Sequence, residues 1–305
     1  MKRIKKLVNI ANLLFILIIL LQFLPNKRIE SDNWNLFAFV GIIEVFFLLS
    51  IAFQKNTENL ETKGDIISIL YIIIIIWEVL TTKLDLLSKT LYPSPETIIK
   101  LFISDFPQLA KGLISSLELL SEGYILALIT AVPLALFIGW RKRLYRAVNP
   151  ITKVLGPIPP IVYVPYAIAL LPTFKGASVF IIFIGVFWPV FINTLSGVFN
   201  VENSIIDSAK VLKVSERTML FKIILPAALP SILNGATLGL VMAFILLTAA
   251  EMIGATSGLG WYVKYFSDFA DYPRVIVGII FIGFVVTVLT FGLDKLEKWL
   301  LRWKR

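Results

Sequence analysis

The chain has 305 residues, of which 58% are hydrophobic and only 16% are charged. Soluble domains contain roughly 45–50% apolar and about 25% charged residues, so this composition is typical of an integral membrane protein. The sequence contains neither Cys nor His, which excludes disulfides, thiol chemistry and imidazole bases and removes the commonest zinc ligands. The net charge of +9 is compatible with nucleic-acid binding, but basic residues flanking membrane spans explain it more simply, and we expect no nucleic-acid partner.

Eight hydrophobic segments follow one another along the chain, and several approach the roughly 20 residues that cross a bilayer core of about 30 Å. They comprise residues 7–24, 36–53, 66–80, 112–140, 151–171, 178–199, 231–254 and 275–293. The first segment follows the basic sequence MKRIKK, as in a signal peptide, but no small-residue cleavage site comes after it, so we expect an uncleaved span. Residues 96–106, before the fourth segment, form a separate amphipathic stretch.

The distribution of Lys and Arg predicts the orientation of these spans. If the N-terminus is cytoplasmic and the spans alternate, the cytoplasmic segments hold 19 of the 29 Lys and Arg residues, against 9 outside and Lys153 within a span. These segments are residues 1–6, 54–65, 141–150, 199–230 and 294–305. We therefore expect cytoplasmic N- and C-termini and a cytoplasmic position for residues 199–230.

Residues 201–230 form the longest polar interruption in the C-terminal two-thirds of the chain. Ser204 precedes Asp207 by three residues, which is the spacing of a capping box at the start of a helix. Apolar residues then recur at steps of three and four positions, which predicts a short helix with one apolar face. They are Ile205, Ile206, Ala209 and Leu212.

A second short helix is expected after a break at Lys213. Ser215 is a candidate N-cap for it, and the helix is expected to end at Pro226 and again at Pro230. A helix–turn–helix between two spans is also compatible with a solvated loop, or with a helix pair lying flat in the lipid headgroups.

Counted from Asp207, the chain reads D-S-A-x-x-x-K, then nine residues, then I-x-L-P. This pattern resembles the EAA loop of binding-protein-dependent ABC importer permeases, which reads E-A-A, three residues, G, nine residues and I-x-L-P. The resemblance implies that the loop docks on a cytoplasmic ATPase and passes ATP-driven closure to the membrane helices. The coupling residues that it implies, together with Ser204, are Asp207, Ser208, Ala209, Lys213, Ile223, Leu225 and Pro226.

Lys213 departs most from that pattern, because it stands where the family has Gly. A Gly between two helices usually adopts a left-handed conformation, which costs a non-Gly residue roughly 1–2 kcal/mol. Either Lys213 adopts this conformation under strain, or the turn is built differently in this chain.

Further short motifs in the region of residues 77–305 resemble the nitrate/sulfonate/taurine branch of these permeases. In chain order they are Pro93-Ser94-Pro95, Ser116-Leu117, Gly123-Tyr124, Phe187-Trp188-Pro189, Asn193-Thr194, Ala250-Glu251 and Ser257-Gly258-Leu259-Gly260. The resemblance implies an all-α polytopic membrane protein with a six-helix type I ABC importer core in residues 66–305. Residues 1–65 would then form an extra N-terminal module of two helices, giving about eight transmembrane helices.

The resemblance also implies the assembly and its location, a multi-pass protein of the bacterial plasma membrane surrounded by lipid. The expected partners are a pair of ABC ATPase subunits, a second copy of the permease and an extracytoplasmic substrate-binding protein. The sequence contains no Walker A pattern, G-x-x-x-x-G-K-[ST], so we expect no cofactor in this chain and expect ATP and Mg to bind the partner ATPase.

Polar residues inside spans are costly and usually functional. Trp188, Asn193, Thr194 and Glu251 are therefore candidates for a translocation path, although interhelical hydrogen bonds are the commoner use of such groups. For Glu251, a structural hydrogen bond and a gate or substrate contact stay open as alternatives. Four prolines between residues 157 and 165 predict irregular helices around a cavity, unless packed neighbours satisfy the freed backbone groups.

Three classes of function remain open at this stage. An ATP-driven importer is favoured, with no catalytic residue in this chain, and the branch resemblance points to taurine, an alkanesulfonate or nitrate. A pyrimidine or other vitamin-precursor heterocycle is the alternative substrate, since Tyr163, Tyr166 and Trp188 offer apolar walls. A secondary transporter would need coupling charges within the membrane, where only Glu44 qualifies, and an intramembrane enzyme lacks a suitable catalytic constellation.

Overall fold

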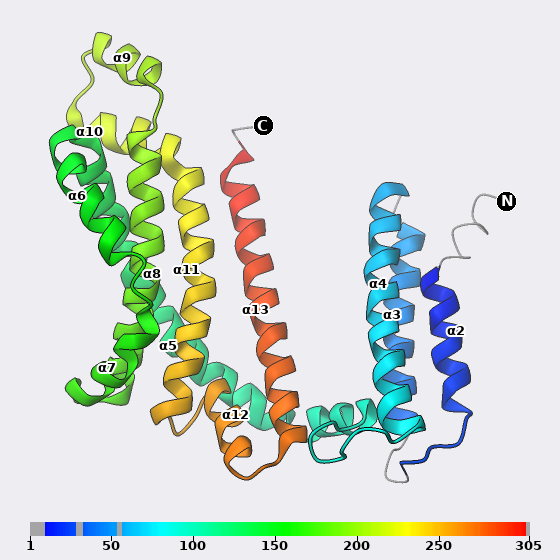
Figure 1. The fold of residues 1–305 in the computed structure, drawn as a ribbon. Coiled ribbons are helices and arrows are strands. Elements are labelled where there is room, and N and C mark those ends of the chain that lie inside the picture. The colour runs from blue at the N-terminus through cyan, green and yellow to red at the C-terminus, as the bar shows by residue number, and fades with distance from the viewer. Residues whose placement is uncertain (1–9, 29–32, 54–56, 303–305) are drawn as a thin grey trace. The chain divides into compact units, whose positions relative to one another are not determined.

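The computed structural model describes residues 10–28, 33–53 and 57–302; the predictions for residues 1–6 and 54–56 lie outside this range. The described residues form helices and connecting loops, without a strand (Figure 1). The helices, including three short η segments, are α2 (Ile10–Gln22), α3 (Asn33–Phe53), α4 (Thr57–Glu78), η1 (Val79–Lys83), α5 (Pro95–Trp140), α6 (Lys142–Leu155), η2 (Pro160–Tyr163), α7 (Val164–Leu170), α8 (Phe174–Phe199), α9 (Asn203–Val211), α10 (Glu216–Thr218), η3 (Met219–Ile224), α11 (Leu225–Gly254), α12 (Leu259–Asp268) and α13 (Tyr272–Leu300).

Six helical stretches of the described chain are long and apolar enough to cross a membrane. They are Asn33–Ala52, Leu60–Lys83, Pro95–Trp140, Phe174–Phe199, Glu216–Gly254 and Tyr272–Leu300. The pair formed by α6 and the stretch Pro160–Leu170 is bent by 75° and can count as one broken span, and α2 is a shorter apolar helix. The all-α polytopic fold class is confirmed. The described part of each of the eight hydrophobic segments is helical, with a break at residues 156–159 in the fifth, but only six or seven of them are long and apolar enough to span a membrane.

The fourth span is longer than the hydrophobic segment that predicts it. The amphipathic stretch at residues 96–106 was expected to be separate, yet it continues into the span within the 46-residue helix α5. Hydropathy marks where a helix meets lipid, whereas the backbone hydrogen bonds that define the helix are indifferent to whether its surface is polar.

The prediction that the second helix of residues 201–230 ends at Pro226 or Pro230 was wrong. The stretch Glu216–Gly254 is continuous through α10, η3 and α11. Pro226 is the second residue of α11 and follows the π-helical turn η3, so its missing N–H falls where the backbone hydrogen-bond pattern of the helix already changes. Pro230 lies inside α11.

The chain divides into two compact units, with boundaries inside α5, α12 and α13, and each unit is described by itself. In the first unit, α2, α3 and α4 lie side by side around buried apolar side chains (Figure 1). The hydroxyl of Tyr71 on α4 donates to Oε2 of Glu44 on α3 at 2.9 Å, with both residues buried. Glu44, which the sequence left without a role, therefore joins two neighbouring helices.

Charged side chains are also buried where α4 ends, and they hold the segment after α2 against it. Nζ of Lys83 donates to the carbonyl of Leu24 at 3.0 Å and to Oδ1 of Asn26 at 2.6 Å. The buried carboxylate of Glu78 lies 3.7 Å from the same Nζ, and Arg28 pairs with Asp85 at 2.9 Å. Since α4 packs with α2 and α3 in one unit, the module boundary between residues 65 and 66 stays a prediction.

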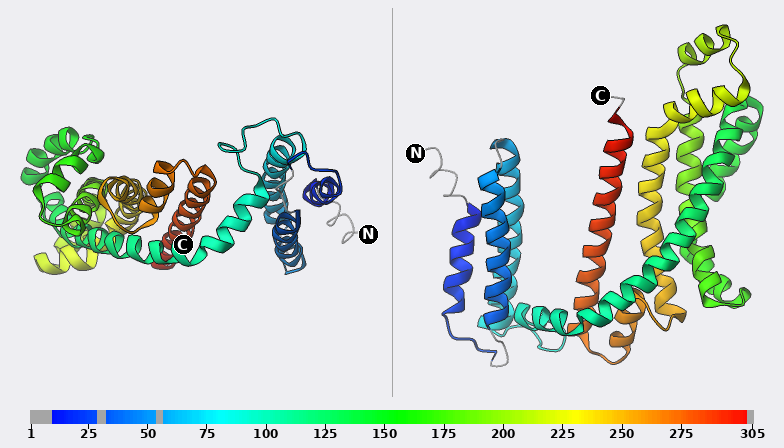
Figure 2. Two further views of the ribbon diagram at one scale, coloured as in Figure 1. Left: turned by 90° about the horizontal axis from the view of Figure 1, so that it is seen from below. Right: turned by 180° about the vertical axis from the view of Figure 1, so that it is seen from behind.

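In the second unit, α8 and α11 run alongside each other and approach closely through glycines (Figures 1 and 2). A Cβ added at Gly235 on α11 would lie 2.9 Å from Cβ of Asn193 and 3.0 Å from the carbonyl oxygen of Pro189 on α8. One at Gly239 would lie 2.9 Å from Cγ1 of Val186. Small residues at such a seam let helix backbones pack closely in membranes.

Candidate coupling segment and translocation path

Residues 203–224, the candidate coupling segment, lie beyond the ends of two long helices of the second unit. Figures 1 and 2 show α9 past one end of α8 and α11, while α7 lies near the opposite ends. The inner face of this segment is apolar and packs on the helix ends, burying Ala209, Met219 and Ile224 beside Leu136 and Val198. The inner face of the segment is therefore packed against the helix ends, and its outer face is exposed.

The capping box expected at the start of α9 was wrong. The helix begins at Asn203, and its N-cap Glu202 makes no side-chain capping bond. Ser204 already lies inside the first turn, where its hydroxyl donates to Oε2 of Glu202 at 3.2 Å instead of accepting from the backbone. Asp207 pairs with Lys210 at 3.0 Å on the surface, so it caps nothing.

Lys213 does adopt the left-handed conformation, with φ of +52°. Its N–H donates to the carbonyl of Lys210 at 2.9 Å, and the N–H of Val214 donates to the carbonyl of Ala209 at 3.4 Å. This pair of bonds is a Schellman motif, which ends α9 and turns the chain toward α10. The first alternative for Lys213 is thus the correct one.

The next helix starts as the sequence predicts. The hydroxyl of Ser215 accepts from the backbone N–H of Thr218 at 3.3 Å, so Ser215 is the N-cap of α10. Arg141, which follows α5, lies 3.5 Å from the carboxylate of Glu216 and stacks over the ring of Phe137 at 4.0 Å. The end of α5 therefore contacts the start of α10.

Replacing Lys213 by Gly is expected to leave the stability of the purified permease unchanged or to raise it by up to ~1 kcal/mol, because Gly relieves the left-handed strain but gains freedom when unfolded. The measurement is the thermal unfolding midpoint in detergent. Lys210→Gly is the matched control, since it also removes a lysine but places Gly inside α9, where it should destabilise by about 0.5–1 kcal/mol. A lower midpoint for Lys213→Gly than for the control would contradict the strain argument.

The remaining residues of the coupling pattern divide between the two faces. Ala209 is buried, and Ile223, Leu225 and Pro226 are partly buried. Asp207, Ser208 and Lys213 are exposed. Among the large apolar residues of the segment, the two most exposed lie outside the pattern: Val211 at 81% and Leu212 at 76%.

The proline-rich break between α6 and α7 borders a cavity of about 340 Å³, as expected from the prolines. Trp188 and Pro189 of α8 and Met242 and Ile245 of α11 complete its wall, opposite residues 156–161. The wall is almost entirely apolar and contains no charged side chain.

Asn193 lies one helical turn from Pro189 and hydrogen-bonds across the α8–α11 seam. Its Nδ2 donates to the carbonyl of Pro189 at 2.8 Å, and its Oδ1 accepts from Nδ2 of Asn234 at 3.1 Å. Asn234 is exposed, and it is not among the residues predicted for the path, because a single Asn in an apolar helix does not indicate its partner. Thr194, the next candidate, is fully buried and presents no surface to a path.

Glu251 is only 1% exposed, and its carboxylate is held by the protein. Oε1 accepts from the hydroxyl of Ser116 on α5 at 2.6 Å, and Oε2 accepts from the backbone N–H of Gly260 at 2.7 Å. The same hydroxyl accepts from the backbone N–H of Leu259 at 2.9 Å, so one carboxylate joins α5 and α11 to the start of α12. Of the two alternatives for Glu251, this geometry supports a structural hydrogen bond between helices and does not support a gate or a substrate contact.

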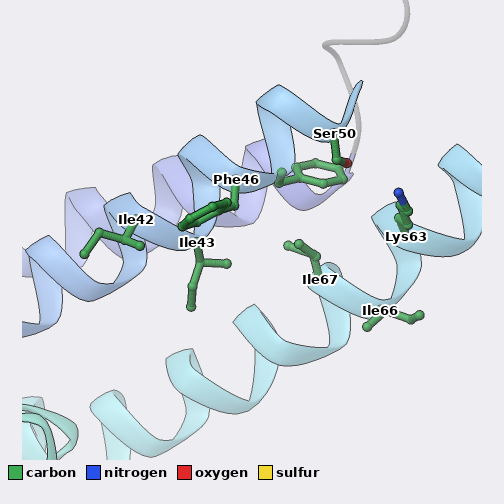
Figure 3. A pocket seen from close by; sticks show the side chains of 8 residues that line it. Ile42, Ile43, Phe46, Ser50, Lys63, Ile66 and Ile67 are labelled. Carbon is green, nitrogen blue, oxygen red and sulfur yellow. The ribbon is translucent and has the colours of Figure 1, made fainter. Parts of the chain in front are cut away.

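Another hollow, of about 400 Å³, lies between α3 and α4 (Figure 3). Isoleucine and phenylalanine side chains line its length, with Ser50 and Lys63 at one end. Polar groups do not converge on it, so it is poorly suited to a small polar substrate. Within the described residues, no group of three or more Asp and Glu side chains is placed to hold a metal ion.

Comparison with known proteins identifies the family. Residues 123–305 match the family model described as the inner membrane component of binding-protein-dependent transport systems. The chain belongs to this family. It is thus the membrane permease subunit of an ABC importer, and the ATPase is a separate subunit.

Individual relatives agree with the family. A putative ABC transporter permease of Methanocaldococcus jannaschii is 32% identical over 262 residues, covering 84% of this chain and 96% of that protein. The taurine transport system permease protein TauC of Escherichia coli is 30% identical over 244 residues, covering 78% and 88%. The nitrate import permease protein NrtB of Leptolyngbya laminosa is 32% identical over 175 residues, covering 57% and 63%.

Among solved structures, the chain resembles the MetNI methionine ABC transporter, crystallised in inward-facing conformations. The TM-score is 0.56 at 16% identity, over 65% of this chain and 98% of that chain. The likeness concerns the fold alone and confirms the type I ABC importer permease architecture.

Proposed function

We propose that this permease imports small anions of the taurine, alkanesulfonate or nitrate type, and that residues 201–225 couple it to its ATPase. The single observation that carries the coupling proposal is that one face of the segment is buried while the other is exposed and carries large apolar side chains. Its inner face is packed on α5, α8 and α11, while its outer face exposes Val211 and Leu212 to a partner. Ser204, Asp207, Ser208 and Lys213 lie on the same segment, and we assign them to the docking surface.

The assembly that we propose contains two copies of this chain, two ATPase subunits that bind ATP and Mg, and an extracytoplasmic binding protein. Both termini and residues 199–230 lie in the cytoplasm of a bacterial cell, in keeping with the 19 of 29 Lys and Arg residues on that side. Lipid surrounds the exposed apolar faces of the spans. Residues 1–65 form an additional membrane module.

The substrate assignment rests on the relatives, which import taurine and nitrate by name. We place the translocation path along Trp188 and Asn193, and leave Thr194 and Glu251 out because both are buried. The apolar wall around Trp188 favours a neutral heterocycle, such as a pyrimidine vitamin precursor, as the second candidate substrate.

The test is uptake into proteoliposomes that contain the permease, its ATPase and its binding protein. Labelled taurine, an alkanesulfonate, nitrate and a hydroxymethylpyrimidine are compared with and without ATP. We expect ATP-dependent uptake of at least one anion and none of the pyrimidine. Uptake of the pyrimidine alone would replace the anion assignment, and uptake driven by an ion gradient without ATP would contradict the coupling proposal.

A further inference from the structure

The span that contains α11 has one face that is exposed along several turns, and this face carries an amide. Asn234, Leu238, Val241 and Ile245 follow one another at helical spacing on this face, and all four are exposed. Three of the four are apolar and compatible with lipid, whereas Asn234 is an amide. An exposed amide within the hydrocarbon is costly unless it meets water or another protein.

The depth of the amide pair follows from the helices that carry it. Asn193 lies six residues before the end of α8 at Phe199, and Asn234 lies nine residues after the start of α11 at Leu225. At 1.5 Å per residue these are roughly 9 and 14 Å from the helix ends next to α9. The pair therefore lies within the spans, in the half that ends at the coupling segment.

The pair also lies next to the wall of the cavity at Trp188. The carbonyl that accepts from Asn193 belongs to Pro189, which lines the cavity, and Ile245 of the exposed α11 face lines it as well. Next to Asn234 on α11, Gly235 packs closely on α8, since an added Cβ would lie 2.9 Å from Cβ of Asn193 and 3.0 Å from the carbonyl oxygen of Pro189. The same pair of helices, α8 and α11, thus carries an apolar cavity and, nearer α9, a polar pair.

We propose that the amides of Asn193 and Asn234 line the translocation path between the cavity at Trp188 and the end of the path near α9, where they donate hydrogen bonds to a passing oxyanion. This inference rests on the proposed function and names the contacts by which the path accepts its substrate. An Asn amide carries two N–H donors, and one hydrogen bond to Asn193 leaves Asn234 a second donor. Uncharged donors favour an anion without holding it strongly, which a transport path requires.

The first experiment tests whether the pair faces water, and it uses the absence of Cys from the sequence. Asn234→Cys in the complete complex, reconstituted in nanodiscs, is exposed to a charged methanethiosulfonate reagent. The matched control is Phe284→Cys, an exposed apolar position on α13. We expect Asn234→Cys to react at least ten-fold faster than the control, because the thiolate that reacts forms in water and not in lipid.

Equal and slow reaction at both positions would place Asn234 against lipid and overturn the proposal. A disulfide between two copies of Asn234→Cys, with no labelling, would show an interface between permease copies instead. Neither readout depends on the substrate, so a wrong anion assignment and a wrong path assignment are told apart.

The second experiment tests the oxyanion contact by uptake of the anion that the intact complex transports. Asn234→Asp is expected to lower uptake at least ten-fold, because it places a negative charge beside the anion. Asn234→Gln, which keeps the amide, is expected to retain at least half of the uptake, as is the control Phe284→Ala. Size-exclusion profiles confirm that each variant is folded. Unchanged uptake by a folded Asn234→Asp complex would overturn the contact.

Discussion

Replacing Val211 and Leu212 together by Asp is expected to detach the ATPase from the permease and to abolish ATP-driven uptake. Both side chains are exposed at the end of α9, immediately before the turn at Lys213. Burial of a Val or Leu side chain in an interface contributes about 1.5–3 kcal/mol. Loss of both contributions weakens binding about 100-fold or more, since each 1.4 kcal/mol is roughly a factor of ten.

The measurement is co-purification of the ATPase in mild detergent, followed by uptake in proteoliposomes. Leu296→Asp is the control, because Leu296 is also an exposed apolar residue, in the last turns of α13, but lies outside the coupling segment. Detachment by both sets of substitutions would indicate general damage. Full ATPase recovery and normal uptake by the Val211→Asp/Leu212→Asp variant would refute docking on this face.

Replacing Glu251 by Ala is expected to destabilise the permease by roughly 2–4 kcal/mol, because it removes the acceptors of two buried donors. The substitution leaves the N–H of Gly260 without its acceptor. It also removes the acceptor on α11 to which the hydroxyl of Ser116 on α5 donates. Gly258→Ala is expected to act on the same contact. Its φ is +128°, and an added Cβ would overlap the Glu251 carboxylate.

The thermal unfolding midpoint of the purified permease measures this effect. Glu118→Ala is the matched control, because Glu118 is a second carboxylate paired across helices, with Nζ of Lys175 at 2.6 Å, but is well exposed. An exposed ion pair contributes about 0–1 kcal/mol, so the control should lower the midpoint far less. Equal shifts for both variants would contradict a buried structural role, and a stable Glu251→Gln variant with altered substrate preference would favour a path role.

The short-range features of the coupling segment show how far local sequence rules reach. The spacing from Asp207 to Pro226 predicts a two-helix segment, and Ser215 is the N-cap that its sequence context predicts. The same rules placed the N-cap at Ser204, two residues after the observed N-cap Glu202, and an end at Pro226, where the helix continues. Capping and proline rules describe one turn of backbone, so they fail where packing on α5, α8 and α11 extends or shifts that turn.

The sequence by itself determined the membrane character, the order of the hydrophobic helices and the two-helix segment that we propose for coupling, because hydropathy, charge and motif spacing are properties of neighbouring residues. Only the tertiary structure decided which polar groups in the spans face inward. Glu251 and Asn234 both lie in the apolar helix α11, yet Ser116 and Gly260 enclose the first, while the second stands exposed beside Asn193. Ser116 and Asn193 are 135 and 41 residues away from Glu251 and Asn234 along the chain, so no pattern of neighbouring residues predicts these contacts.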